Sequence, residues 1–346
     1  MTGVVLAANN GEVGGGEVML LATAEVLREL GVDAEVVGPD AEGGVLDHAE
    51  AAGFPVHRLA ADRRRYAHEL REWHRGRDDA LTWCHGLVPS LATAGRRHRV
   101  VHLHQLPSRT HRAALLAARS GATATLAPSR WLAARVSGAA VLPNWTADPS
   151  AIREVRVRRP ADGPPRLGFL GRHTVDKGLV VLAEALAAVP EADRPHLVLA
   201  GEPRFTDDAT ARRVTEALEP LGAGVERLGW VEPATLFAAV DGLVVPSVAP
   251  EAFGLAGAEA MAAGVPVLVT DAGALPELVG PEHPWVCPAG DADALRDTVA
   301  AWARATWDEL TAVAAAQRTR WELEYSPHAG RERIATLLRD LHVRPA

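Results

Sequence analysis

Short apolar runs alternate with longer amphipathic stretches along most of the chain. In the first half, apolar residues recur at helical spacing over about 16–30, and Gly31 follows where a helix C-terminal cap belongs. Apolar and β-branched residues predict strands at Val4–Ala7, Ala34–Val37, Pro55–Arg58, Ala80–Cys84, Val100–His104, Ala124–Ala127 and Ala140–Leu142. Strand–helix alternation of this kind predicts a parallel sheet with helices on both faces.

The alternation is interrupted at 158–165, where charges, prolines and a glycine predict a linker. It then resumes, and from Asp291 onward the pattern predicts helices alone. We therefore expect an N-terminal domain over 1–157, a second domain over 166–325, and a C-terminal helix over 326–346 that can cross back onto the N-terminal domain. The second domain should contain strands at Leu167–Leu170, Leu197–Ala200, Glu226–Leu228, Leu243–Val245 and Val267–Val269.

Composition narrows the range of functions. The net charge is −8, which argues against a nucleic-acid partner, because such proteins need a basic face. The two cysteines, Cys84 and Cys287, are far apart and support neither a disulfide framework nor a cysteine metal site. No apolar run is long enough to span a bilayer, and the first ten residues lack the basic stretch and cleavage site of a signal peptide. We therefore expect a cytoplasmic location.

Loops that follow strands are where ligands bind in such sheets. The first of these, from Asn9 to Glu17, is rich in glycine and opens a helix, so its amides could hold an anion. It has neither the dinucleotide-binding glycine pattern nor the Lys-Ser/Thr pair of a P-loop. On its own, a structural turn explains this loop equally well.

A second loop, from Gly171 to Gly178, carries two cations after the first strand of the second domain. Lys177 is the single lysine among 36 basic residues of the chain, and Arg172 precedes it on the same loop. Two fixed cations suit a diphosphate, which needs its charge neutralised. The alternative is a pair of solvated surface charges, and the rarity of lysine favours a function.

The segment from Pro250 to Pro266 carries the most specific pattern. A helix is predicted from about Gly254 to Ala263, which places Glu251 before the helix and Glu259 inside it. The backbone amides of Phe253, Gly254 and Leu255 open this helix and could bind an anion. The two carboxylates should therefore meet hydroxyl groups or a cationic centre. Simple capping by Glu251 and a surface position for Glu259 are the alternatives.

Taken together, these segments resemble retaining glycosyltransferases of family 4, which have the GT-B fold, over nearly the whole chain. The two glutamates, with seven residues between them, resemble the family signature, and Gly14 to Glu17 resembles its Gly-Gly-x-Glu loop. Gly171 to Gly178 resembles its Gly-Arg…Lys-Gly loop. Further matches are Ala200 to Pro203, Leu228 to Val231, and Pro143-Asn144, where Trp145 replaces the usual glycine.

The resemblance implies two Rossmann-like, doubly wound α/β domains that face a central cleft, with a helical C-terminus. It implies a metal-independent hexosyltransferase that uses a nucleoside-diphosphate sugar as donor substrate and needs no cofactor. The acceptor would be a small molecule or a lipid-linked or other glycan.

It also implies individual roles. Arg172 and Lys177 would hold the diphosphate, Glu259 the ribose, and Glu251 the transferred sugar. His104 would reach the reaction centre from the acceptor domain. The remaining donor-binding groups would be Gly15, Gly16 and the backbone of Phe253, Gly254 and Leu255.

Some features have simpler explanations. Asp291 and Asp293 look like an Asp-x-Asp metal site, but a helix N-cap explains them better, and we expect no metal. The arginines at 63–65, 71, 75 and 77 could dock on an anionic membrane, although a solvated helix face is the commoner explanation. Trp73 and Trp145 could stack on a sugar, but packing is the commoner role.

Two other functions stay open. A nucleotide-sugar 2-epimerase of similar fold would need acid–base carboxylates around the sugar and no acceptor site. A non-catalytic sugar-nucleotide sensor would bind without turnover.

Overall fold

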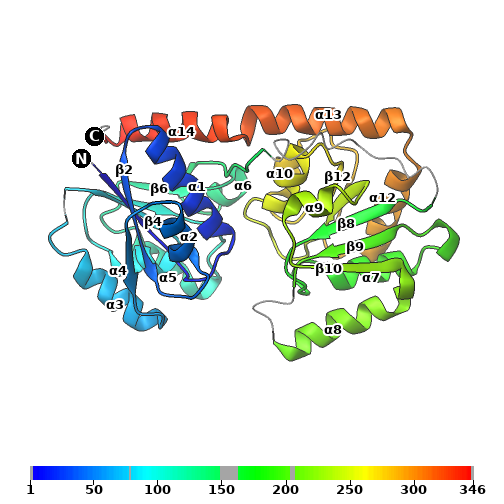
Figure 1. Ribbon diagram of the computed structural model, residues 1–346, viewed down its shortest axis with the longest axis horizontal. Helices are drawn as coiled ribbons and strands as arrows, with labels where there is room; N and C mark the ends of the chain where they lie inside the picture. Colours follow the sequence, from blue (N-terminus) through cyan, green and yellow to red (C-terminus); the bar gives the residue numbers. More distant parts are fainter. Residues whose placement is uncertain (1–2, 78, 149–162, 203–206, 344–346) are drawn as a thin grey trace. The chain divides into compact units, whose positions relative to one another are not determined.

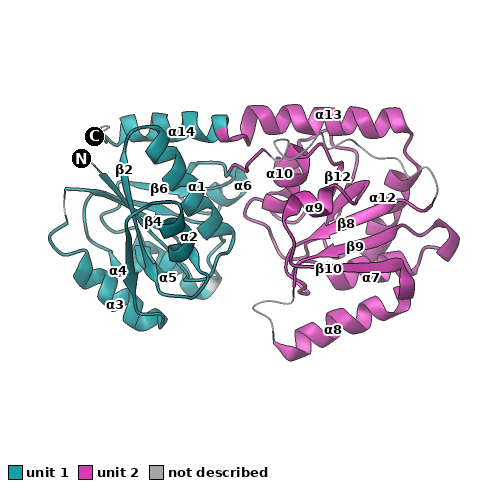
Figure 2. Ribbon diagram, viewed as in Figure 1, with its two compact units in different colours: residues 1–144, 328–346 teal, residues 145–327 magenta. Residues whose placement is uncertain are grey.

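The computed structural model describes residues 3–77, 79–148, 163–202 and 207–343 (Figure 1). The chain divides into two compact units (Figure 2). Unit 1 comprises Met1–Asn144 and His328–Ala346, and unit 2 comprises Trp145–Pro327. The predicted boundary at 157 and most of the predicted linker lie outside the described residues.

Unit 1 is built on a parallel sheet of seven strands in the order β3-β2-β1-β4-β5-β6-β7. The order reverses between β1 and β4, the arrangement typical of a doubly wound sheet. The strands are β1 (Gly3–Ala7), β2 (Asp33–Pro39), β3 (Val56–Leu59), β4 (Leu81–His85), β5 (Arg99–His102), β6 (Ala124–Ala127) and β7 (Ala140–Val141).

Unit 1 carries α1 (Gly15–Glu29), α2 (Val45–Ala51), α3 (Arg63–Trp73), α4 (Leu87–Ala92), α5 (Arg112–Ala118) and α6 (Arg130–Ala133). Val5 and Ala7 of β1 pack in one cluster with Tyr66 and Leu70 of α3. Val4 and Leu6, which point to the opposite face, are also buried. Both faces of this sheet are therefore covered, as the alternating pattern predicted.

Unit 2 has a parallel sheet of six strands in the order β10-β9-β8-β11-β12-β13. The strands are β8 (Arg166–Leu170), β9 (His196–Ala200), β10 (Val225–Gly229), β11 (Gly242–Val245), β12 (Val267–Thr270) and β13 (Val286–Cys287). Sequence reasoning missed β13, because two residues are too few to show a strand period.

The helices of unit 2 are α7 (Leu179–Ala187), α8 (Asp208–Leu218), α9 (Pro233–Phe237), α10 (Leu255–Ala262), α11 (Leu275–Val279), α12 (Ala292–Arg304) and α13 (Trp307–Glu324). Short 3₁₀ turns lie at Glu191–Asp193 and Glu219–Gly224 in this unit, and at Arg109–His111 in unit 1. The last helix, α14 (Pro327–Asp340), follows α13, and the helical C-terminus is as expected. Its Arg331 lies 3.6 Å from Glu29 at the end of α1.

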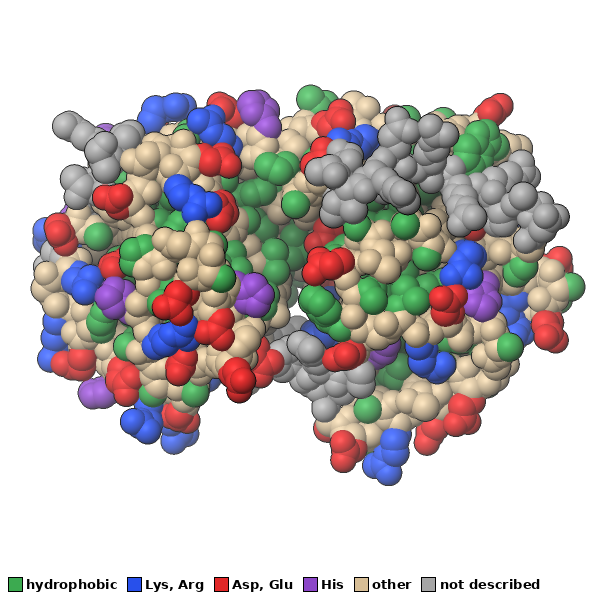
Figure 3. Space-filling view, viewed as in Figure 1, with side chains coloured by type: hydrophobic (Ala, Val, Ile, Leu, Met, Phe, Trp, Pro, Cys, Tyr) green, Lys and Arg blue, Asp and Glu red, His purple; other side chains and the backbone are tan. Residues whose placement is uncertain are grey.

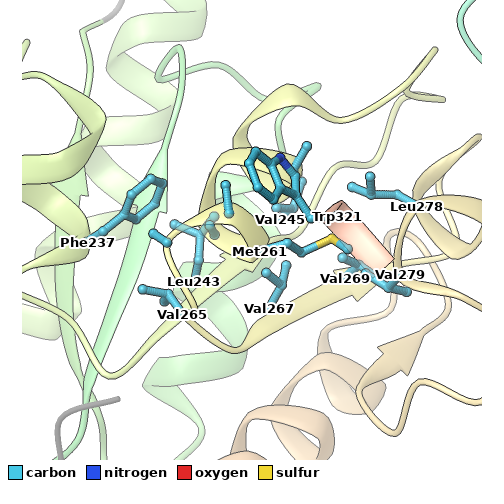
Figure 4. Packing of buried hydrophobic residues seen from close by; sticks show 14 of the residues in the cluster. Phe237, Leu243, Val245, Met261, Val265, Val267, Val269, Leu278, Val279 and Trp321 are labelled. Atoms are coloured by element: carbon cyan, nitrogen blue, oxygen red, sulfur yellow. The ribbon is translucent and has the colours of Figure 1, made fainter. Parts of the chain in front are cut away.

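Alternate residues of the unit 2 strands enter two separate cores. Leu197 and Leu199 of β9 pack in one cluster with α7, α8 and α12. Val198 and Ala200 pack in the other with α10 and with Trp321 of α13. Figure 4 shows Met261 of α10 lying within this second core. Helix α10 is thereby held by its apolar side, which fixes the loop that precedes it.

On the face drawn in Figure 3, acidic and basic side chains intermix over the surface of each unit. Among the described helices, none combines the length and the apolar character needed to cross a membrane.

Candidate functional site

The strand order of unit 2 reverses between β8 and β11, so the loops that follow these two strands meet at one edge of the sheet. Doubly wound sheets bind their ligands at this point. The loop after β8 is Gly171 to Gly178, and the loop after β11 runs from Pro246 to Gly254. Tertiary structure therefore brings together the two segments that the sequence marked out separately.

The two loops are fastened to each other through their backbones. The carbonyl of Asp176 accepts hydrogen bonds from the amides of Val248 and Ala249, at 2.9 and 3.1 Å. Gly178 has a φ of +80°, and a Cβ there would lie 1.7 Å from the carbonyl oxygen of Pro246. Glycine is therefore required at 178 for two reasons, the positive φ and the close backbone approach.

At this junction Lys177 and Glu251 form an ion pair. The Nζ of Lys177 donates to Oε1 of Glu251 at 2.6 Å, and the Ser247 hydroxyl donates to the same oxygen at 2.6 Å. The side chains of Lys177 and Glu251 are 28% and 17% exposed. The pair is partly shielded from water but still reachable by a ligand. Sequence reasoning missed Ser247, although a polar residue directly after a buried strand was an available signal.

The backbone of Glu251 is also fixed. It forms an isolated parallel bridge with Gly273, and its carbonyl accepts from the amide of Ala274 at 2.9 Å. A Cβ at Gly273 would lie 2.3 Å from the Glu251 carbonyl oxygen, and its φ is +71°. The loop after β12 thus fixes the backbone from which the Glu251 side chain extends.

Arg172 lies on the more open side of the same loop. Its guanidinium is 3.7 Å from the Asp176 carboxylate, and its side chain is 43% exposed. An open depression of about 550 Å³ lies beside it. The residues that line it are Arg172, Thr174, Val175, Asp176, Asp207, Thr210, Val248 and Ala249. Arg172 is therefore available to an incoming anion, since its ion pair is long and solvated.

Helix α10 begins at Leu255, one residue later than predicted, with Gly254 as its N-cap at a φ of +104°. The Phe253 ring is buried and packs edge-on against Tyr325 at 5.3 Å, so this residue can offer only its backbone. The first amides of a helix have no carbonyl partner within it and form its positive end. The segment from Phe253 to Leu255 is therefore suited to an anion, and its role in donor binding stays a prediction.

Glu259 is one turn further along α10 and is partly buried. Burial raises its pKa to about 7, and the negative charge of Glu232 adds to the effect. A carboxylate held in this way accepts hydrogen bonds from neutral donors such as hydroxyl groups more readily than it tolerates a second anion.

In unit 1 the corresponding reversal point lies between β1 and β4, where the Gly-rich loop begins. Helix α1 starts at Gly15, and Glu17 turns back onto the loop. Its carboxylate accepts from the amides of Asn10 and Gly14, at 3.0 and 3.3 Å, and burial raises its pKa. Glu17 therefore closes the loop and leaves Gly15 and Gly16 at the helix start.

Three histidines gather beside this loop. The prediction that His104 ends a strand was wrong, since β5 ends at His102 and His104 lies in the following loop. Nδ1 of His85 lies 3.0 Å from Nε2 of His104, and the rings of His102 and His104 are 4.2 Å apart. A Cβ at Gly16 would lie 3.2 Å from the His104 ring, so Gly16 makes room for it. The sequence indicated that His102 lies two residues before His104 and that His85 ends the preceding strand, and the parallel pairing of β4 with β5 brings the three together.

The simpler explanations proposed for two other features hold. Asp291 is the N-cap of α12 and accepts from the Ala294 amide at 2.9 Å, and Asp293 pairs with Arg296. Trp145 is 4% exposed and belongs to the interior.

The arginine-rich helix α3 has local partners at its C-terminal end. Arg75 pairs with Glu72, while Arg77 pairs with Glu35 and lies over the Trp73 ring. A solvated helix face, rather than a membrane contact, stays the prediction for this helix.

Residues 164–304 match the family model described as "Glycosyl transferases group 1". The chain is 36% identical to a glycogen synthase of Mycobacterium tuberculosis over 130 residues, which cover 35% of this chain and 30% of that protein. It is 35% identical to a phosphatidyl-myo-inositol mannosyltransferase of Mycobacterium leprae over 152 residues, 41% of this chain and 39% of that one. The matches thus span only about a third of these curated relatives.

The whole chain resembles solved structures. Anabaena HepE in complex with UDP and glucose superposes with a TM-score of 0.81 at 22% identity, covering 98% of this chain and 100% of that one. A glycosyltransferase from Rickettsia africae gives 0.78 at 15% identity, covering 99% of each chain. The fold is therefore the GT-B type, two parallel α/β units with a helical C-terminus. Together with the family match, it supports a glycosyltransferase.

Proposed function

We propose that this protein is a retaining, metal-independent hexosyltransferase that moves a sugar from a nucleoside-diphosphate donor to an acceptor hydroxyl. The observation that carries the proposal is the Lys177–Glu251–Ser247 group at the reversal point of the unit 2 sheet, directly before α10. This group places the Lys177 cation, the Glu251 carboxylate and the N-terminus of α10 together at the edge of the sheet where ligands bind. UDP and UDP-glucose occupy Anabaena HepE structures of this fold, which makes uridine the first base to test.

In the reaction, the bond between the anomeric carbon and the diphosphate oxygen breaks, and its electron pair leaves with the diphosphate. The acceptor hydroxyl forms the new bond to that carbon, and its proton leaves with the diphosphate. Negative charge grows on the departing group, where Lys177, Arg172 and the amides before α10 would stabilise it. These positive groups are the reason for proposing that no metal is needed.

Positive charge grows on the sugar at the same time. Glu251 is the carboxylate fixed nearest the cation, so we assign it to the sugar, where it stabilises the oxocarbenium-like centre. Its ion pair with Lys177 would break when the diphosphate binds the Lys177 ammonium group. Glu259, one turn along α10, is assigned to the ribose hydroxyls. Gly15 and Gly16 of unit 1 are assigned to donor binding, and His104 of the same unit is assigned to the reaction centre.

Separate substitution of the two glutamates tests these roles. Glu251→Gln should lower kcat by roughly a hundredfold, because it removes a group that acts on developing charge. UDP affinity should stay nearly unchanged or rise slightly, because Lys177 loses a charged partner that competes with the diphosphate. Glu259→Gln should weaken UDP and raise KM, because it removes a group that binds ground state and transition state alike. Glu216→Gln on the exposed face of α8 is the matched control. If Glu251→Gln loses UDP affinity while Glu259→Gln loses only turnover, the two roles are reversed.

A panel of nucleotide sugars tests the reaction class. Release of nucleoside diphosphate together with a new glycoside of unchanged anomeric configuration supports the proposal. A new isomer of the donor sugar would instead identify an epimerase, and tight binding without turnover would identify a sensor.

A further inference from the structure

The three histidines of unit 1 leave buried ring nitrogens without partners. His85 is 0% exposed and His102 1% exposed. In the described part of the chain, no partner is found for either nitrogen of His102, for Nε2 of His85 or for Nδ1 of His104. Buried polar atoms without hydrogen bonds are costly and rare, so the two unpaired nitrogens of His102 favour a ligand at this position. Among the described residues, the facing nitrogens of His85 and His104 have only each other as partners, at 3.0 Å.

The nitrogens are already close enough to share one small ligand. One ring nitrogen from each histidine can be chosen so that all three lie within 4.8 Å of one another. Three nitrogens bound to zinc at about 2.0–2.1 Å in tetrahedral geometry are roughly 3.3 Å apart. The pair formed by His85 and His104, at 3.0 Å, would need to widen slightly, and any pair near the 4.8 Å limit would need to close.

We propose that His85, His102 and His104 form a site for one divalent transition-metal ion of the zinc class, with water as the fourth ligand. Three neutral imidazoles with an open fourth position are a known zinc ligand set, and imidazole also suits copper and nickel. The sequence expectation of no metal rested on the N-cap role of Asp291, on the two cations that face the leaving group and on the lack of a convincing ligand cluster, and it did not consider these histidines as ligands.

The protonation state of the cluster favours metal binding. Burial lowers the pKa of His85 and His102 well below the ordinary value and that of His104 to about 4. All three rings are therefore neutral near neutral pH, and binding needs only the tautomers that leave the facing nitrogens bare.

Binding should be exchangeable rather than permanent. Metal-bound histidines usually donate their second ring N–H to a neighbour, which strengthens the site, and here Nε2 of His85 and Nδ1 of His104 have none among the described residues. The positive start of α1 also lies beside His104, at Gly16, and opposes a cation.

One consequence rests on the proposed function. If His104 serves the transfer reaction, a metal ion bound to its nitrogen removes it from that task. Zinc should then lower turnover, and EDTA should restore it.

Zinc titration of the EDTA-treated full-length protein, followed by calorimetry, tests the site without any assay of activity. We expect one equivalent of Zn²⁺ to bind. His102→Phe should weaken binding by at least roughly 100-fold, because losing a ligand should cost more than the roughly 10–100-fold cost of losing an outer-shell partner. Phenylalanine keeps the ring shape and removes no hydrogen bond, so the variant should fold. His68→Ala, exposed on α3, is the matched control and should bind normally.

Cobalt(II) substitution identifies the ligands. An absorption spectrum of tetrahedral nitrogen ligation, lost in His102→Phe and in the more exposed His104→Ala, supports the site. Zinc binding that is unchanged in both variants, no binding at all, or a thiolate band from Cys84 would overturn it. Zinc binding that leaves turnover untouched would overturn the inhibitory role of the metal.

Discussion

Replacing Glu259 by glutamine should make the protein more stable and a poorer nucleotide binder. The carboxylate is partly buried on α10, and burial together with the charge of Glu232 raises its pKa from 4.5 to about 7. Glutamine has nearly the same shape but carries no charge. The substitution therefore separates the energetic penalty of the charge from the packing of the side chain.

The direction of the effect depends on pH. Well below pH 4.5 the carboxyl is protonated in both the folded and the unfolded chain, and it makes the free energy of unfolding no more dependent on pH. Between about 4.5 and about 7 the unfolded chain ionises first, so the free energy of unfolding of the wild type falls as pH rises. Above about pH 7 this decrease in the free energy of unfolding is complete, and it amounts to at most roughly 3 kcal/mol.

Urea unfolding of wild type and Glu259→Gln at about pH 5 and about pH 8 measures this difference. The variant should exceed the wild type by up to roughly 3 kcal/mol at the higher pH and by up to about 1 kcal/mol at the lower. Calorimetry with UDP should show weaker binding by the variant. An equal gain in stability at both pH values would refute the ionisation argument, and unchanged UDP affinity would refute the assignment to ribose.

Further expectations follow from the same site. Lys177→Ala should weaken UDP binding in calorimetry and cut turnover by roughly 100-fold or more, and Lys177→Arg should also be impaired because a planar fork does not replace a compact ammonium. Unaltered UDP affinity in Lys177→Ala would exclude a role for Lys177 in binding the diphosphate. Gly178→Ala should lower the free energy of unfolding by at least roughly 2 kcal/mol in urea, since its Cβ would overlap the Pro246 carbonyl, and a stable variant would show that the loop can move. Transfer activity should survive EDTA, and loss that magnesium or manganese restores would show that the donor needs a metal.

Periodicity located nearly all the strands within one or two residues, because each buried parallel strand is a distinct apolar run. It failed at β13, where two residues leave no period, and at the end of β5, where the alternation Val-His-Leu-His runs past the last strand residue. The donor-side residues Arg172, Lys177 and Glu251 were recognisable because each lies in a loop that follows a predicted strand, and Glu259 was recognisable by its spacing from Glu251 inside the next helix.

The sequence by itself determined the two α/β units, the ligand-side loops and the helix that follows Glu251 and contains Glu259. These features follow from local apolar periodicity and from glycine and capping residues. Only the tertiary structure decided which loops meet. The reversal of strand order puts the loops after β8 and β11 side by side, and so pairs Lys177 with Glu251, which are far apart in the chain. Parallel pairing of β4 with β5 likewise sets His85 level with His102. Strand order depends on long-range packing, which no local pattern encodes.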